Sequence, residues 1–192
     1  MSGFTLVETL IAITIVTLSV AGPLYSASRS LVAAQSAEGK LIATYLAQEG
    51  IEYVREMRDD SYLDAYRIGG ANVSTDAWNE FISGAGTASV TQCRGTSAAP
   101  LTCTLDPVQV AGSPFTACSG AGCTPLYRRN DGVYTQQQTG NTRTPYTRTI
   151  QVFSVPDAAA SPTEVRVVSR TSWDFHGVTQ SVTVTDHLTP WQ

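Results

Sequence analysis

Residues 4–21 read FTLVETLIAITIVTLSVA, an apolar run that contains a single charged residue, Glu8. No further charge follows until Arg29. A run of about 20 apolar residues is long enough for an α-helix to cross the hydrocarbon core of a bilayer. The run therefore predicts a helix surrounded by lipid or by other apolar helices, followed by enough chain for one small domain.

A helical pattern continues past this run to about Arg58. The expected buried stripe consists of Ile42, Leu46, Tyr53 and Met57, with Leu31, Leu41, Ile51 and Val54 beside them. A helix from Phe4 to Arg58 would be about 80 Å long at about 1.5 Å per residue, which exceeds the core of a small domain. We therefore expect residues 4–28 to form a transmembrane or filament-core helix, and residues 29–58 to be its amphipathic continuation.

Pro23 lies inside this helical pattern. Proline lacks an amide hydrogen and its ring clashes with the preceding turn, so a kink or a locally melted turn is expected there. Gly22, Gly39 and Gly50 are expected to be further soft points, because glycine is a poor helix former.

Residues 59–192 are expected to form a globular head, which gives the chain an α+β fold. A short helix is predicted at Ser74–Ile82, capped by Ser74. Its expected inward-facing side chains are Trp78, Phe81 and Ile82. The sequence Asn130-Asp131-Gly132 predicts a hairpin turn, because Asp-Gly tolerates the positive φ that such turns need.

Residues 145–187 are expected to form an antiparallel sheet. The predicted strands are Thr147–Val155, Glu164–Phe175 and Val178–Thr185, with a turn at His176-Gly177. Alternation places Val165, Val167 and Trp173 on one face of their strand, and Val178, Val182 and Val184 on one face of the next. The second half of the long helix is the expected cover, because its apolar stripe also needs a partner.

All four cysteines lie in residues 83–126, a loop-like region rich in small and hydroxyl side chains. They are Cys93, Cys103, Cys118 and Cys123, and four cysteines allow three disulfide pairings. Sequential pairing, Cys93–Cys103 and Cys118–Cys123, is favoured because it closes the smallest loops. A zinc site is the alternative, but structural zinc usually shows close CxxC pairs, which this chain lacks. Disulfides would indicate that the head matures in an oxidising compartment.

The composition argues against several classes of protein. Hydrophobic residues make up 42 % of the chain and charged residues 15 %, which is apolar enough to bury a core. The net charge is −4, so the basic surface of a nucleic-acid-binding protein is not expected. The two histidines, His176 and His187, form no metal-like pair, and there is no nucleophile elbow or phosphate loop. We expect a protein without catalytic activity, cofactor or metal.

Glu8 is the residue that most needs a chemical explanation. A carboxylate inside a hydrocarbon segment is costly unless it is paired or protonated. It lies one helical turn from Phe4, whose α-amino group would become free if the chain were cleaved before it. In a bundle of staggered copies, that amine can approach Glu8 of a neighbour, so that pairing cancels both charges and fixes the axial register. The local alternative is a glutamate stabilised by the dipole of the helix start.

The hexamer Gly3-Phe4-Thr5-Leu6-Val7-Glu8 ahead of an apolar helix resembles the processing signal of type IV pilins and type II secretion pseudopilins. The resemblance implies a leader of residues 1–3, cleavage after Gly3 by the prepilin peptidase, N-methylation of Phe4 and an assembly role for Glu8. Family leaders usually carry Lys or Arg, which this one lacks. A looser similarity to minor, pilus-modification-type pilins lies in three segments, Ala47–Glu52, the valine-rich strand ending at Trp173, and Leu188–Trp191.

The resemblance implies a type IV pilin-like fold and a structural role as a minor pilin. Its partners would be the prepilin peptidase, other pilin subunits, the inner-membrane assembly platform and, before assembly, membrane lipid. The chain would be a single-pass inner-membrane protein with its head outside the cytoplasm, and later part of a cell-surface filament. One alternative is a pseudopilin of a type II secretion system. Another is a secreted binding or adhesive domain released by signal peptidase near Ala21.

Overall fold

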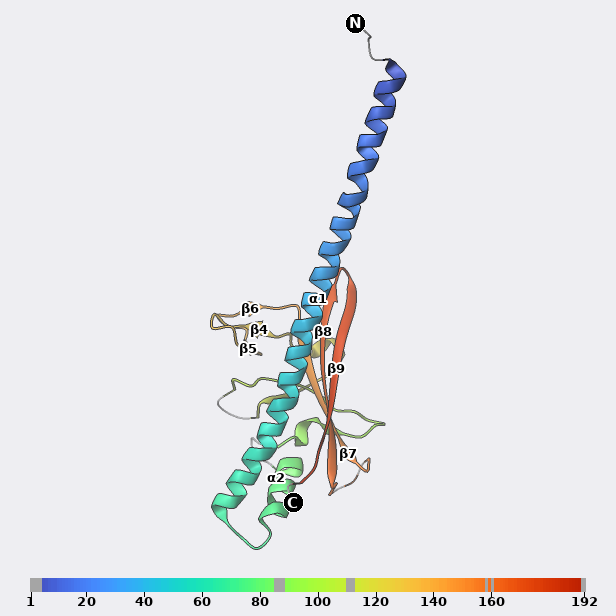
Figure 1. Cartoon of the computed structure of the whole chain (residues 1–192). Coiled ribbons are helices and arrows are strands. Elements are labelled where there is room, and N and C mark those ends of the chain that lie inside the picture. The colour runs from blue at the N-terminus through green and yellow to red at the C-terminus, as the bar shows by residue number, and fades with distance from the viewer. Residues whose placement is uncertain (1–4, 85–88, 110–112, 158, 160, 191–192) are drawn as a thin grey trace. The chain divides into compact units, whose positions relative to one another are not determined.

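A computed structural model describes residues 5–84, 89–109, 113–157, 159 and 161–190. They belong to two compact units that are divided in sequence after Leu41. The elements, labelled in Figure 1, are α1 (Leu6–Ile68), α2 (Val73–Ser83), η1 (Thr91–Cys93), β1 (Arg94–Gly95), β2 (Thr102–Leu105), β3 (Phe115–Cys118), η2 (Gly120–Gly122), β4 (Tyr127–Arg128), β5 (Tyr134–Thr135), β6 (Thr142–Arg143), β7 (Thr147–Val155), β8 (Glu164–Phe175) and β9 (Val178–Leu188).

In the first unit, α1 is helical from Leu6 onward. The helix continues through Pro23 without interruption, so the locally melted turn expected there is wrong for the described residues. A proline inside a helix removes one backbone hydrogen bond, and the helix accommodates that loss here.

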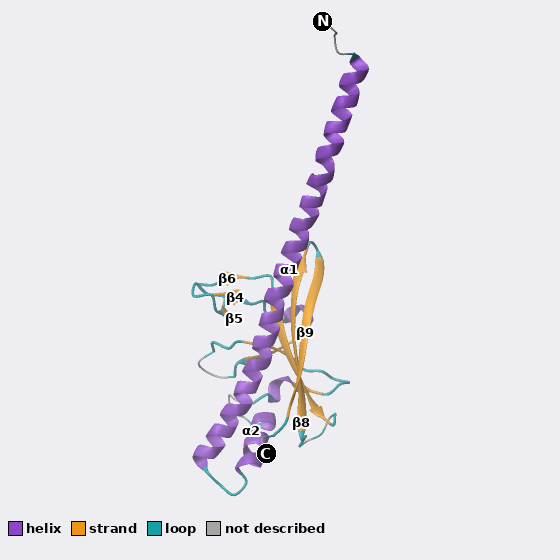
Figure 2. Cartoon of the chain, in the orientation of Figure 1, coloured by secondary structure: helices purple, strands orange, loops and turns teal. Residues whose placement is uncertain are grey.

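The second unit is built on a six-stranded sheet with the order β3-β2-β7-β8-β9, in which β1 also pairs with β7. All pairs are antiparallel except the short parallel contact of β1 with β7. The long strands β7, β8 and β9 form the meander predicted from the sequence, drawn in orange in Figure 2. A long apolar helix followed by an antiparallel sheet confirms the α+β class.

The second half of α1 covers this sheet through most of the expected stripe. Leu46, Ile51, Val54 and Met57 are buried as predicted, and Ile42 and Tyr53 are partly buried against the core, whereas Leu31 and Leu41 are exposed. The centre of the buried stripe is made of small residues, namely Ala43, Ala47 and Gly50. Counting only large apolar residues missed this, because a close helix–sheet contact favours small side chains.

At Gly50, helix α1 approaches the sheet closely. The sequence predicted a soft point of the helix at this glycine and did not predict its role in packing. A Cβ at this position would lie 2.6 Å from Ser169 Oγ and 3.0 Å from Ile150 Cδ1. The side chain of Ser169 on β8 is small and fully buried. Helix and sheet therefore meet through a glycine on one side and a serine on the other.

Helix α1 extends to Ile68, beyond the expected end near Arg58. It ends at Gly69, whose φ of 75° suits glycine and whose N–H donates to the carbonyl of Ala65. Helix α2 begins at Val73, so Ser74 lies inside the helix rather than at its cap. Trp78, Phe81 and Ile82 are buried as predicted, and Trp78 Nε1 donates to the carbonyl of Pro162 at 2.6 Å.

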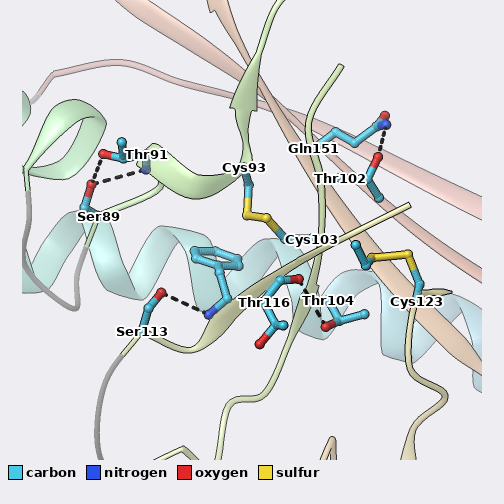
Figure 3. The surroundings of a disulfide bond; sticks show 12 residues. Ser89, Thr91, Cys93, Thr102, Cys103, Thr104, Ser113, Thr116, Cys123 and Gln151 are labelled. Carbon is cyan, nitrogen blue, oxygen red and sulfur yellow. Dashed lines mark hydrogen bonds between the residues drawn. A yellow bond between two sulfur atoms is a disulfide. The ribbon is translucent and has the colours of Figure 1, made fainter. Parts of the chain in front are cut away.

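The cysteine-containing region holds two disulfides, Cys93–Cys103 and Cys118–Cys123, which confirms the sequential pairing. The first joins η1 to β2 (Figure 3). The region expected to be a loop contains the short strands β1, β2 and β3, which extend the sheet beyond β7. The predicted turn at 130–132 connects β4 to β5, and Gly132 has a φ of 90°.

We predict that Gly50→Ala lowers the free energy of unfolding by about 1–3 kcal/mol, because the added methyl group collides with a packed sheet. Thermal unfolding of the full-length protein in detergent measures this. The matched control is Gly22→Ala, since a Cβ there meets nothing within 4 Å. Adding Ser169→Ala to Gly50→Ala removes the nearest atom and should recover part of the loss. Equal stability of the Gly50→Ala variant and the wild type would contradict this view of the contact.

Candidate functional site

The first half of α1 presents an apolar surface that the chain itself leaves uncovered. Leu6 is 76 % exposed and Leu18 is 75 % exposed, and the other large apolar side chains between them are exposed as well. By length and composition, this helix is able to cross a membrane, and none of its most apolar window is buried within the protein. Contact of such an apolar surface with water is unfavourable.

The hydroxyl groups of this segment are satisfied inside the helix. Each one donates to a backbone carbonyl of the preceding turn: Thr9 to Leu6, Thr14 to Ile11, Thr17 to Ile13 and Thr14, and Ser19 to Val16. Such bonds remove the need for water, which a hydrocarbon environment does not supply. The segment is thus compatible with an apolar surrounding at these positions.

Glu8 differs from those hydroxyl residues. Its backbone N–H donates to Thr5 Oγ1 at 3.3 Å, as in a helix whose first residue is capped by threonine. Its carboxylate, however, has no hydrogen-bond or ionic partner among the described residues, and the side chain is exposed. Gly3, the expected cleavage site, and Phe4, whose amine is the expected partner of Glu8 in a neighbouring copy, lie outside the described residues.

The apolar segment is followed by a polar and aromatic pair. Arg29 Nη2 donates to the hydroxyl of Tyr25 at 2.6 Å, and the guanidinium carbon lies 5.1 Å from the centre of the tyrosine ring. Tyrosine and arginine are typical of the boundary between hydrocarbon and water. The pair therefore provides a natural end to the membrane-compatible segment.

In the second unit, Arg148 ties α1 to the sheet. Its side chain is fully buried, and Nη1 donates to the carbonyl of Leu46 at 3.2 Å and to Glu49 Oε2 at 2.5 Å. Nη2 donates to the carbonyl of Leu105 at 3.1 Å, while Nε has no partner among the described residues. Burial lowers the pKa of Arg148, and the charge of Glu49 opposes that shift.

Asp106 is a second buried charge in the same region. Its carboxylate accepts hydrogen bonds from Thr135 Oγ1 at 3.0 Å and from the N–H of Val108 at 3.2 Å. It also contributes an attractive charge to Arg148. The buried arginine and aspartate therefore link α1, β7, the end of β2 and the small sheet of β4, β5 and β6.

The far edge of the sheet carries a more exposed ion pair. Arg55 Nε donates to Asp186 Oδ2 at 2.9 Å, and Arg55 also contacts Glu52 at 2.6 Å. Partial burial alone would raise the pKa of Asp186, but the hydrogen bonds from Arg55 and from the backbone of His187, together with the charges of these two residues, outweigh it and the pKa is lowered. The pair connects α1 to β9.

Sequence reasoning predicted the cysteine pairing but missed Arg148 and Asp106. The signal for Arg148 was present, because it shares the alternation of Ile150 and Val152, both of which face the core. A charged residue in a strand is usually assigned to the solvent-facing side, so the alternation alone does not predict that Arg148 is buried. No group of His, Cys, Asp or Glu in the described part of the chain is arranged to hold a metal ion.

Comparison with protein-family models, with curated proteins and with solved structures found no match to this chain.

We predict that Arg148→Met lowers the stability of the second unit by about 3–5 kcal/mol, because Glu49 and two buried carbonyls lose their donor. The matched control is Arg55→Met, which also breaks a helix–sheet ion pair. The side chain of Arg55 is 41 % exposed, and water replaces its contacts, so its loss is expected to cost at most about 1 kcal/mol. Chemical denaturation followed by tryptophan fluorescence compares the two variants. Similar losses for both would contradict the role assigned to Arg148.

Proposed function

We propose that this chain is a structural subunit, of the minor class, in a type IV pilin-like filament. Its N-terminal helix packs among the helices of other subunits, and its sheet-containing head lies on the outside. The prepilin peptidase removes residues 1–3, and the amine of Phe4 becomes methylated. Before assembly, the helix resides in the inner membrane.

One observation carries this proposal. Among the polar side chains between Leu6 and Leu24, Glu8 alone lacks a partner among the described residues, whereas the hydroxyl groups bond to their own helix. An unpaired carboxylate in an apolar surrounding is unfavourable by several kcal/mol. A cation supplied by another copy removes that penalty, and the new N-terminal amine is the cation that processing after Gly3 would create.

The same pairing gives the assembly a register. A purely apolar helix could slide along its neighbours, since dispersion and hydrophobic contacts have little directional preference. A single buried polar contact penalises every displaced arrangement, as polar residues do in coiled-coil seams. Glu8 therefore favours one axial step between subunits.

The rest of the chain supports the same role. The helix is long enough to lie in a filament core while its second half remains attached to the head through Gly50 and Arg148. Two disulfides in the head suit an exported domain. A pseudopilin of a type II secretion system would use the same geometry, and is the second candidate. Release by signal peptidase near Ala21 is less favoured, because α1 runs unbroken across that position.

We predict that Glu8→Leu leaves the protein in the membrane fraction and strongly reduces its entry into filaments, because the amine of the neighbouring copy loses its partner. Immunoblots of sheared filaments and of membranes from the same cells measure both quantities. Glu38→Leu, which removes a carboxylate beyond the apolar segment, is the control and should assemble normally. Normal filament entry of the Glu8→Leu variant would rule out this role for the carboxylate.

We further predict that the mature chain begins at an N-methylated Phe4 and that Gly3→Leu blocks this processing. Mass spectrometry of the purified membrane protein identifies the first residue. Gly22→Leu serves as the control, because it alters the position after Ala21 without touching the leader. A mature start near Gly22 would instead indicate release of the head by signal peptidase.

A further inference from the structure

Strand β9 is an unprotected sheet edge. It is the last strand in the order β3-β2-β7-β8-β9, and among the described strands it pairs only with β8. Val178 to Ser181 are all exposed, and from Val182 onward the residues alternate between positions that are at least partly buried and exposed positions. The strand contains no Pro, Gly, Lys or Arg that would interrupt or shield its edge.

The hairpin geometry determines which backbone groups of β9 are free. The two-residue turn His176-Gly177 joins Phe175 to Val178, and this flanking pair is hydrogen-bonded in such hairpins. Hydrogen-bonded and non-hydrogen-bonded pairs alternate along an antiparallel ladder, so the even-numbered residues of β9 bond to β8. The outward-pointing N–H and C=O groups therefore belong to Thr179, Ser181, Thr183, Thr185 and His187.

Proteins usually block such an edge. Common devices are a short strand, a lysine, a proline or a bulge. The opposite edge of this sheet ends in the four-residue strand β3, which is closed by the disulfide Cys118–Cys123. By contrast, β9 pairs with β8 in an unbroken register from Val178 to Leu188, without a bulge.

The sequence of β9 is complementary to itself in one antiparallel register. With Thr183 opposite Thr183 of a second copy, Ser181 lies opposite Thr185 and Thr179 opposite His187. Facing Thr and Ser side chains can share hydrogen bonds across strands. On the other face, Val182 lies opposite Val184, Val178 opposite Leu188, and Gln180 opposite Asp186. Every pair is compatible, and no like charges meet.

We propose that β9 is a contact surface for a second copy of this chain, which adds its own β9 in antiparallel orientation centred on Thr183. The pairing satisfies the free backbone groups of both edges and joins two sheets into one across a two-fold axis. It uses residues of the second unit alone and does not rest on the filament role.

The direction of the strands indicates where this contact can occur. Arg55 contacts Asp186 and Arg58 donates to the carbonyl of Thr189, so β9 runs in the same direction as the second half of α1. In the two-fold pair, these helical halves therefore point in opposite directions. The contact itself is independent of the filament role; under the proposed function, in which subunits of one filament all point the same way, the paired copies belong to different filaments.

Cysteine cross-linking of the full-length protein in detergent tests the register. The four natural cysteines form disulfides with one another, so an introduced cysteine is the only free thiol. Directly opposed, hydrogen-bonded residues have Cα atoms about 5.5 Å apart, within the range of a disulfide. Thr183→Cys should therefore form a covalent dimer after mild oxidation. A mixture of Thr179→Cys and His187→Cys should form the mixed dimer, which neither gives alone.

The matched control is Arg170→Cys on β8, which lies beside Thr183 on the same face but one strand from the edge. It should yield several-fold less dimer than Thr183→Cys. Equal cross-linking of the two variants, or none with Thr183→Cys, overturns the proposal.

A second measurement does not require cysteine. Thr183→Lys places two like charges in direct opposition and should weaken the dimer several-fold in sedimentation, while Thr183→Val should retain it. A wild-type protein that remains monomeric, or whose β9 pairs with a strand of another protein, also overturns the proposal. Filament entry of the Thr183→Lys variant should stay normal, which separates this contact from the role of Glu8.

Discussion

The contact between the second half of α1 and the sheet is the constraint on which the second unit depends. Gly50 lets the helix backbone approach β7 and β8, and this close approach brings the carbonyl of Leu46 within reach of Arg148. The arginine is fully buried and makes bonds to two backbone carbonyls and to Glu49. A buried guanidinium is tolerated only when it is paired in this way, so the small residues of the helix and the arginine of the sheet are mutually dependent.

The first half of α1 differs from the second half, because it is not buried against the sheet. It buries none of its most apolar stretch within the chain and bonds its hydroxyl groups to its own backbone. What it leaves unsatisfied is apolar surface and one carboxylate. Both needs are met by the same kind of partner, an apolar helix with a free amine at its start, which is why a filament of identical or similar helices is the function we favour.

The two edges of the sheet differ in how many backbone N–H and C=O groups their edge strands leave unpaired. On one side, short strands and a disulfide leave little backbone free. On the other side, β9 is long and uninterrupted, and its inward-facing charge, Asp186, is already neutralised by Arg55. Because the outward backbone groups on this edge have no strand partner among the described residues, an association that supplies one is favourable wherever its side chains also match.

The sequence by itself determined the elements that depend on local pattern. The apolar helix, the strands at 147–155 and 164–175, the Asp-Gly and His-Gly turns and the sequential disulfides all follow from spacing and composition. Only the tertiary structure decided the small-residue centre of the buried stripe of α1, the roles of Gly50, Arg148 and Asp106, and the strands within the cysteine-containing region. These features depend on which surfaces approach each other across long stretches of sequence, because a small or charged residue is buried only when its distant partner provides the space or the hydrogen bonds that it needs.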